Sequence, residues 1–336
     1  MTRTRITIAA IVAALLAGAA AFYTGRATAP DTTPGATTQA APAQGERKVL
    51  YWHDPMVPGP RFDKPGKSPF MDMPLVPVYA EEGSESSVKV SAAIQQFKPW
   101  AIINASGYVR IDAAESDADR CLRENATASA VLAAQCASAG IRLVTFSSDQ
   151  VFDGTARRPY VESDPASPVN VYGHSKALAE RDVLALCPQA MVVRTSAFFG
   201  PWDQHNYVVH ALSALSHGKA FEAADDVRIS PTYVPDLVRV CLDLLIDGEA
   251  GLWHLANVGD VTWAELAERA ATRMGIATAS LRRTTGAARG EVAARPSYSV
   301  LSSERALLMP TLDDALARFA NEQQHIDLSR HRRFAR

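Results

Sequence analysis

The sequence predicts an α/β fold for most of the chain, with a parallel sheet covered by helices on both faces. From about residue 97 to residue 321, short apolar runs alternate with helix-length segments. Such alternation is typical of strands joined by helices, and runs this apolar suit strands that are buried on both faces. Of the 336 residues, 47% are hydrophobic and 21% are charged, so the chain can bury a core.

The elements of this part follow one another in a regular order. We expect strands at 101–105, 142–147 and 191–195, and helices at about 115–139, 171–187 and 311–321. Helices placed between short strands in this way predict parallel strand pairing, because a parallel pair needs a long crossover connection.

The first 29 residues are predicted to be a signal peptide or a membrane anchor. Arg3 and Arg5 precede an uncharged apolar run at 6–23, and small residues follow at 27–29. The small residues suit cleavage by a signal peptidase, while an apolar run of this length can also just span a bilayer. Both readings place the N-terminus at the inner membrane or in the periplasm. Residues 30–46, rich in Pro, Thr and Ala, predict a flexible linker.

A Pro-rich block at residues 47–82 contains a cluster of methionines. Met56, Met71 and Met73 are three of the 7 methionines in the chain, and His53 lies nearby. Thioether sulfur is a soft ligand that favours Cu(I) or Ag(I), so the cluster is a candidate metal site. The alternative is that these methionines fill a small hydrophobic patch.

The same block resembles the N-terminal region of periplasmic adaptor subunits of copper/silver efflux pumps, in the text DKPGKSPFMDMPLVPVY. The resemblance runs from about residue 48 to residue 82, and residues 88–96 resemble the start of the adaptor body. It implies a heavy-metal-binding segment, an adaptor-like linker at 83–96 and efflux-pump components as partners. The hairpin, lipoyl-like and barrel domains of an adaptor do not follow.

A second constellation lies in the predicted α/β part. Tyr172 and Lys176 stand four residues apart in VYGHSKALAE, so they face one side of a predicted helix. An ammonium beside a phenol favours the phenolate, so we expect Lys176 to lower the pKa of Tyr172 towards neutral pH. Ser148, at the end of a predicted strand, could polarise a substrate carbonyl. A solvated helix face is the alternative reading of the Tyr–Lys pair.

Five segments in order narrow the family: IINASGYVRIDAAE, FSSDQVFDG, PYVESDPASPVNVYGHSKALAE, VVRTSAFFG and ISPTYVPDL. Together they resemble dTDP-4-dehydrorhamnose reductase, an extended short-chain dehydrogenase/reductase. The resemblance covers about residues 97–321 and implies a Rossmann-like NAD(P)-binding domain at 97–325, followed by a basic tail at 326–336. It implies NAD(P)H-dependent reduction of a 4-keto-6-deoxy sugar nucleotide, as in dTDP-L-rhamnose-type biosynthesis, by an oxidoreductase of a cytoplasmic type.

The resemblance also implies roles for single residues. Tyr172 would donate a proton as hydride reaches the keto carbon, and Lys176 would hold the nicotinamide ribose. Ser148 would bind the carbonyl oxygen, with Asp149 beside it on the substrate. The cofactor, NADPH or NADH, would also be lined by Ala105, Ser106, Gly107, Tyr108 and Phe146.

Two positions depart from the family pattern. Gln150 stands where the family usually has Tyr, and Ala197 stands where it has a Trp that helps to hold the nucleotide sugar. Trp202 is a nearby aromatic residue that could compensate. These departures leave the nucleotide specificity open.

The family fold should open with a strand and a glycine-rich turn that holds the cofactor pyrophosphate. None of the glycines before residue 97 has GxGxxG or GxxGxxG spacing. We therefore expect a truncated sheet that lacks its first units, and impaired cofactor binding. Three hypotheses remain: an impaired sugar-nucleotide reductase, a membrane-tethered Cu(I)/Ag(I)-binding adaptor fragment, or a non-functional fusion of the two at about residue 96–97.

Composition argues against other classes of protein. The net charge of −2 gives no sign of the basic surface that binds nucleic acid. The 4 cysteines are scattered and form no CxxC pair, so a disulfide scaffold, a zinc site and a redox motif are not supported. These cysteines are Cys121, Cys136, Cys187 and Cys241.

Overall fold

The computed structural model describes residues 49–53, 61–62, 64–67, 69, 76–79 and 82–334. The predicted signal or anchor at 1–29 and the linker at 30–46 lie outside the described residues, as do the candidate ligands Met56, Met71 and Met73. Within the described ranges, no helix is both long enough and apolar enough to cross a membrane.

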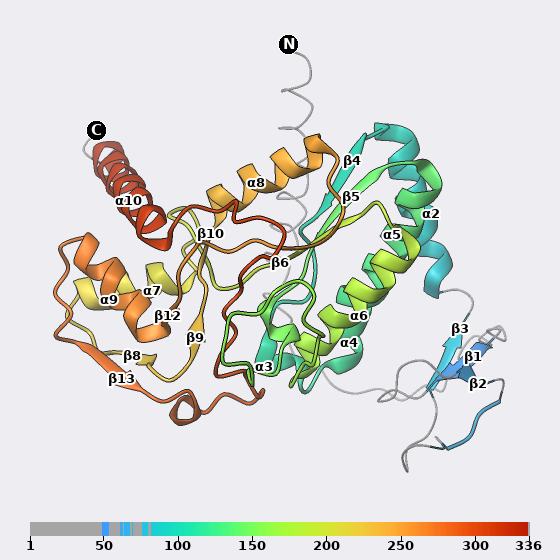
Figure 1. The fold of residues 1–336 in the computed structure, drawn as a ribbon, viewed down its shortest axis with the longest axis horizontal. Coiled ribbons are helices and arrows are strands. Elements are labelled where there is room, and N and C mark those ends of the chain that lie inside the picture. The colour runs from blue at the N-terminus through green and yellow to red at the C-terminus, as the bar shows by residue number, and fades with distance from the viewer. Residues whose placement is uncertain are drawn as a thin grey trace, which may run out of the picture. The chain divides into compact units, whose positions relative to one another are not determined.

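A parallel sheet of four strands forms the centre of the α/β part (Figure 1). The strands are β4 (Ala101–Asn104), β5 (Arg142–Phe146), β6 (Met191–Arg194) and β11 (Gly251–His254). They lie in the order β11-β6-β5-β4, and all three pairings are parallel. The three predicted strands and their parallel pairing are thus confirmed, and β11 adds a fourth strand.

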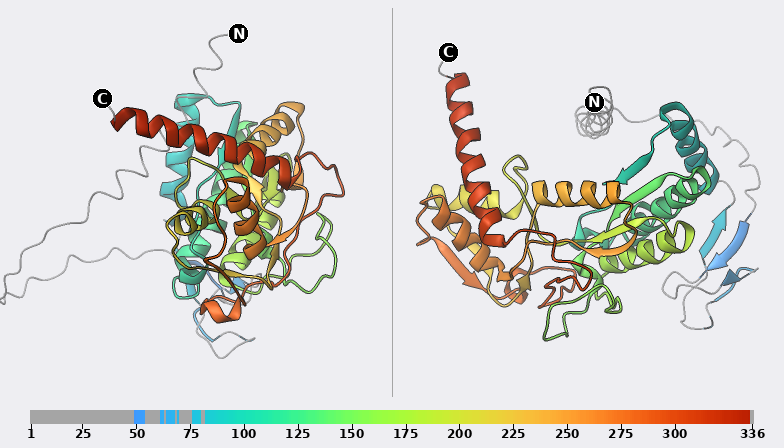
Figure 2. Two further views of the ribbon diagram at one scale, coloured as in Figure 1. Left: turned by 90° about the vertical axis from the view of Figure 1, so that its left-hand side faces the viewer. Right: turned by 45° about the horizontal axis from the view of Figure 1, so that its top comes forward.

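Helices cover both faces of this sheet, because strand side chains alternate between two apolar clusters. Leu143 and Val192 point to the face covered by α5 and α6, while Val144, Met191 and Val193 point to the face covered by α8. Figure 2 shows these helices on opposite sides of the strands. The helices are α5 (Ala128–Ala139), α6 (Val171–Leu186) and α8 (Val234–Asp247). The expected two-sided covering is confirmed.

The helix predicted at about 115–139 is divided into shorter segments. They are α3 (Ile111–Ala114), α4 (Ala118–Leu122), a π-helical turn η1 (Arg123–Thr127) and α5. The break falls at residues 115–117, where Asp117 leaves the helical conformation ahead of α4. The apolar periodicity continues across this break, which is why the sequence alone suggests one helix.

The segment 83–96, expected to be a linker, is helical instead. Helix α2 (Glu82–Phe97) packs on α5, and Ile94 adds to the apolar cluster on that face of the sheet. The first half of the segment is rich in Ser and Glu, which resembles a linker, while the apolar residues that allow packing come in its second half. The α/β part therefore begins before residue 97.

Strand β4 lies at the edge of the sheet among the described residues. It pairs with β5 on one side only, and Ile103 on this strand is 39% exposed. Phe97 and Trp100, just before the strand, are 61% and 54% exposed. In a doubly wound sheet, a strand of the first unit lies against this edge. No second strand pairs with β4 among the described residues.

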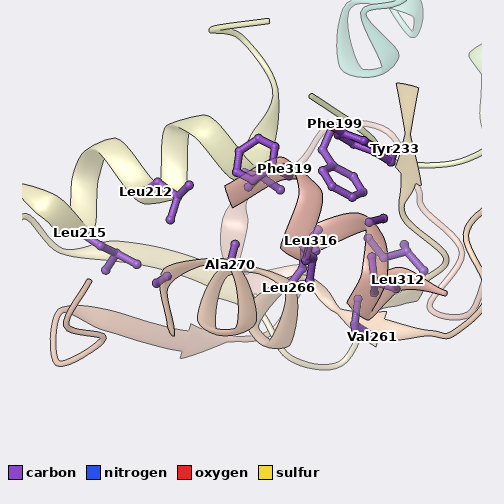
Figure 3. Close-up of a cluster of buried hydrophobic side chains, with 14 residues drawn as sticks. Phe199, Leu212, Leu215, Tyr233, Val261, Leu266, Ala270, Leu312, Leu316 and Phe319 are labelled. Carbon is purple, nitrogen blue, oxygen red and sulfur yellow. The ribbon is translucent and has the colours of Figure 1, made fainter. Parts of the chain in front are cut away.

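A second group of elements packs around a core of its own (Figure 3). Phe199, Leu212, Leu266, Leu316 and Phe319 are buried and converge there. The helices are α7 (Tyr207–Ser216), α9 (Trp263–Arg273) and α10 (Leu312–Phe334). The strands are β7 (Phe198–Phe199), β8 (Phe221–Ala224), β9 (Arg228–Ile229), β10 (Thr232–Tyr233), β12 (Val261–Thr262) and β13 (Leu281–Thr284). Helix α10 begins at the predicted position and continues through most of the expected basic tail.

Local sequence signals set several helix ends. Helix α9 begins with a capping box, in which Thr262 and Glu265 each accept a hydrogen bond from the other's backbone N–H. Asn170 caps α6 by accepting from the N–H of Gly173. Helix α8 ends at Gly248, whose φ of 84° favours glycine.

The Pro-rich block contains a small antiparallel sheet of three strands. They are β1 (Val49–His53), β2 (Arg61–Phe62) and β3 (Val76–Tyr79), in the order β2-β1-β3. His53 pairs with Arg61 on one side and with Val76 on the other. No group of three His, Cys, Asp or Glu side chains suitable for a metal occurs in the described part of the chain.

Candidate active site

A cavity of about 380 Å³ lies at the carboxyl ends of β5 and β6. Ser147 and Ser148 follow β5, Thr195 and Ser196 follow β6, and all four line this cavity. The opposite wall comes from the second group of elements, including Trp263. Ligands of doubly wound sheets bind beyond the carboxyl ends of the strands, so the cavity is where a substrate is expected.

The structure brings the three predicted catalytic residues together. Ser148 and Tyr172 line the cavity, and the Lys176 Nζ lies 5.8 Å from the centroid of the Tyr172 ring. Lys176 is 9% exposed and donates a hydrogen bond of 3.2 Å to the carbonyl oxygen of Phe146, another predicted residue. Tyr172 and Lys176 therefore face the strand ends rather than solvent, which excludes the solvated-face reading.

The expected effect of Lys176 on Tyr172 is wrong. Burial raises the pKa of Tyr172 well above its usual value, the nearby Asp149 carboxylate raises it further, and a hydrogen bond with Ser148 opposes this rise. Burial also lowers the pKa of Lys176, to about 8. At neutral pH the phenol keeps its proton, so Tyr172 is suited to donate it.

The loop after β4 carries the predicted cofactor residues at 105–108. Ala105 and Ser106 are exposed, and Ser106 bonds to the side chain of Asn104. A Cβ on Gly107 would lie 2.5 Å from Asn125 Oδ1 and 3.6 Å from the Lys176 Nζ, so glycine keeps the space beside Lys176 open.

Asn125 holds this loop and was not predicted from the sequence. It accepts from the N–H of Tyr108 (2.8 Å), donates to the carbonyl of Tyr108 (3.1 Å) and donates to Ser175 Oγ on α6 (2.9 Å). Asn125 belongs to the π-helical turn η1, and such turns occur often at functional sites. No sequence pattern predicts this π-helical turn, so Asn125 could not be identified from the sequence.

Unpartnered polar groups lie near the predicted cofactor residues Gly107 and Lys176. The buried hydroxyls of Tyr108 and Ser147 have no hydrogen-bond partner in the described part of the protein. A bound ligand would satisfy such groups. Beside the free edge of β4, however, the described chain has no glycine-rich strand–turn–helix unit for the pyrophosphate.

Asp149 also lines the cavity, and the residue is 5% exposed. Its Oδ1 accepts a hydrogen bond from Ser148 (3.0 Å), and its Oδ2 accepts from Ser196 (2.8 Å) and Ser299 (2.6 Å). Burial raises the pKa of Asp149, while the serine hydroxyls oppose that rise. Ser196 and Ser299 were not predicted as site residues. Their segments, VVRTSAFFG and RPSYSVL, show no motif for this contact.

Gln150 and Gly173 bring the start of α6 against the end of β5. A Cβ on Gly173 would collide with the carbonyl oxygen of Gln150, so only glycine allows this approach. The Gln150 side chain lines the cavity and accepts a hydrogen bond of 3.2 Å from Asn170. The close contact holds Tyr172, the neighbour of Gly173, at the cavity that Ser148 also lines.

The other departure from the family pattern also lies at the cavity. Ala197 lines it with a φ of 41°, in the left-handed region that non-glycine residues rarely adopt. Trp202 is 64% exposed and is not among the cavity-lining residues, so it does not replace the missing Trp. Phe198, Tyr207 and Trp263 supply the aromatic surface of the cavity instead.

A salt bridge made by a residue of the cavity wall was also not predicted from the sequence. Arg295 lines the cavity and forms two hydrogen bonds of 2.9 and 3.0 Å with the carboxylate of Asp112 on α3. Asp112 also accepts from the N–H groups of Val292 and Ala293 (3.1 Å each), and these contacts lower its pKa to about 2. The pair ties the 291–296 wall to the α/β part.

Comparison with known proteins decides the family. The family model described as RmlD substrate binding domain matches residues 74–323, which is most of the chain. The chain belongs to the RmlD substrate-binding domain family. The match begins before residue 97 and includes α2. A second model, described as heavy metal binding domain, matches residues 51–78 and agrees with the predicted heavy-metal-binding segment.

Individual reductases are similar to most of this chain. The dTDP-4-keto-6-deoxy-D-glucose reductase of Streptomyces niveus is 33% identical over 220 residues, covering 65% of this chain and 75% of its own. The dTDP-4-dehydrorhamnose reductase of Mycobacterium tuberculosis is 37% identical over 210 residues, which cover 61% of this chain and 69% of the reductase. A crystal structure of the Bacillus anthracis dTDP-4-dehydrorhamnose reductase with NADP has a TM-score of 0.68 and 29% identity, covering 70% and 85%. The sugar-nucleotide reductase resemblance and the Rossmann-like fold are thereby confirmed.

Proposed function

We propose that this chain binds a dTDP-linked 4-keto-6-deoxy sugar in the cavity at the strand ends and that Tyr172 protonates the keto oxygen. The observation that carries this proposal is the meeting of Tyr172, Lys176 and Ser148 at the cavity. The dTDP-sugar reductases among the relatives support the substrate class. NADPH or NADH, when bound, would supply the hydride.

The chain's own residues would do the remaining work. Tyr172 holds its proton at neutral pH and would release it to the oxygen that gains negative charge. Lys176, still mostly an ammonium at neutral pH, would stabilise the phenolate that results. Gly107 and Lys176 would hold the nicotinamide ribose, and the unpartnered hydroxyl of Ser147 would contact the ligand.

We also propose that cofactor binding is weak. The pyrophosphate is normally held by backbone N–H groups of a glycine-rich turn and a helix N-terminus. The described residues offer no such unit beside β4. Turnover would then require millimolar NADPH. The test is an assay of the whole chain with a dTDP-4-keto-6-deoxy sugar, in which reduced sugar should form only at high NADPH. Saturation at micromolar NADPH would contradict the proposal.

A second function rests on the N-terminal block. We propose that residues 47–82 bind Cu(I) or Ag(I) through Met56, Met71 and Met73. The match of residues 51–78 to a heavy metal binding domain supports this proposal. A membrane tether through residues 1–29 and efflux-pump partners belong to the same proposal.

Replacing Met56, Met71 and Met73 together by Ile is expected to abolish Ag(I) or Cu(I) binding, because Ile keeps the apolar volume and removes the sulfur ligands. Competition with a Cu(I) chelator measures the loss in the whole chain. Met274→Ile, outside the block, is the control and should bind metal normally. Unchanged uptake by the triple variant would refute the thioether site and favour the hydrophobic-patch alternative.

A further inference from the structure

The contacts of Asp149 suggest a role beyond the direct contact with substrate that the family resemblance implies. Each of its carboxylate oxygens already accepts at least one hydrogen bond, from the hydroxyls of Ser148, Ser196 and Ser299. Among the described residues, none with a positive charge forms a salt bridge or hydrogen bond with it. A buried carboxylate with only neutral donors is stabilised less than one paired with a cation, so its neutral form is favoured. A proton on Asp149 would change the hydrogen bond between Asp149 and Ser148.

Ser148 lines the cavity together with Tyr172 and is hydrogen-bonded to Asp149. Its Oγ donates to Asp149 Oδ1 (3.0 Å) and accepts from the N–H of Gln150 (3.2 Å). A serine hydroxyl has one proton only. While Asp149 is ionised, the carboxylate takes that proton, and Ser148 has none to offer a carbonyl oxygen in the cavity.

Protonation of Asp149 reverses the direction of this hydrogen bond. The acid would then donate to Ser148 Oγ, and the Ser148 proton would be free to point into the cavity. We propose that Asp149 is a positioning residue that acts through Ser148: when protonated it turns the Ser148 hydroxyl towards the substrate carbonyl, and when ionised it turns that hydroxyl away. This inference rests on the proposed function, because the carbonyl belongs to the proposed substrate.

Other titratable groups share this environment. Tyr172 and Lys176 lie on α6, and Glu291 and Arg295 lie on the cavity wall, where they form a salt bridge of 3.2 Å. Arg295 also forms a salt bridge with Asp112, so its positive charge is already paired with two other carboxylates. Burial raises the pKa of Asp149, in agreement with a role for its neutral form.

The protonation of Asp149 can be measured without turnover. We expect the carboxyl carbon of Asp149, followed by ¹³C NMR in the whole chain labelled at Asp Cγ, to titrate above the usual Asp pKa of about 3.9. Ser299→Ala removes one hydroxyl donor to the ionised form, so it should move this midpoint to still higher pH and identify the resonance. Titration of Asp149 at or below the usual value would overturn the inference, whatever the chain does with a sugar nucleotide.

The coupling to substrate is tested by binding. Affinity of the wild-type chain for a dTDP-4-keto-6-deoxy sugar should fall about tenfold as pH rises through the Asp149 midpoint, the effect of losing one hydrogen bond. In Asp149→Asn the amide N–H₂ can donate to Ser148 at every pH, so affinity should stay high and independent of pH. Asp153→Asn, in the same segment but outside the cavity lining, should keep the wild-type pH dependence.

These experiments distinguish a failure of the role assigned to Asp149 from a failure of the proposed function. A uniform loss of affinity at all pH values in Asp149→Asn would show a merely structural role and overturn the inference. If no dTDP-linked sugar binds at any pH, the proposed function fails, and the ¹³C titration still decides whether Asp149 carries the proton.

Discussion

Tyr172→Phe is expected to reduce the turnover of a 4-keto-6-deoxy sugar nucleotide by about 10²- to 10⁴-fold, the usual contribution of a general acid. The phenol lines the cavity together with Ser148, and burial keeps it protonated at neutral pH. Phe retains the ring and removes only the hydroxyl, so affinity for the sugar nucleotide should change little. The measurement is the rate of NADPH oxidation at millimolar NADPH, beside the dissociation constant for the nucleotide sugar.

Tyr160→Phe is the matched control for this variant. The Tyr160 hydroxyl donates to Asp153 (2.9 Å), and the residue is not among those that line the cavity. Its loss should cost about 1 kcal/mol of stability and leave turnover within a factor of about three. If Tyr172→Phe kept wild-type turnover, or if both variants lost turnover equally, the role of Tyr172 as proton donor would be refuted.

Glu180→Ala is expected to lower the free energy of unfolding by about 3–5 kcal/mol, because it leaves a buried charge without its partner. Arg194, on β6, forms two hydrogen bonds of 2.8 and 2.7 Å with Glu180 on α6, and the two side chains are 4% and 7% exposed. Arg194 also contacts His254 Nε2 on β11 (3.3 Å). The pair joins α6, which carries Tyr172 and Lys176, to the centre of the sheet.

Urea denaturation measures this effect, with Glu124→Ala as the control. Glu124 pairs with Arg120 at a surface position, where the two side chains are 36% and 43% exposed. Such an exposed pair contributes at most about 0.5 kcal/mol. Equal losses of stability in the two variants would contradict the account of Arg194 and Glu180 as the connection between α6 and the sheet.

Periodicity and composition were sufficient to predict the sheet. The apolar runs at 101–105, 142–147 and 191–195 are strands because their side chains pack on both faces, as Val144 and Leu143 do. Helix α2 was missed, since its first half is Ser- and Glu-rich and its packing on α5 is a tertiary contact that no local pattern reports. The absence of the first units stays a prediction, which follows from the definite spacing of a glycine-rich turn and its absence before residue 97.

The site was only partly predictable. Tyr172 and Lys176 are four residues apart on a helix, so their shared face followed from helix geometry. The shifts of their pKa values did not follow, since burial is the largest cause of both: it raises the pKa of Tyr172 and lowers that of Lys176. Ser299 reaches Asp149 across 150 positions of the chain. Contacts at such a separation depend on the fold, and single-sequence reasoning has no means of pairing them.

The central claim is that the chain keeps a nucleotide-sugar cavity and lacks the part that holds the cofactor phosphates. Calorimetric titration of the whole chain with dTDP-L-rhamnose and, separately, with NADPH tests it most directly. We predict micromolar affinity for the nucleotide sugar and a dissociation constant of about 1 mM or weaker for NADPH, a difference of about 4 kcal/mol in binding free energy. Micromolar binding of NADPH, or no binding of the nucleotide sugar, would contradict the claim.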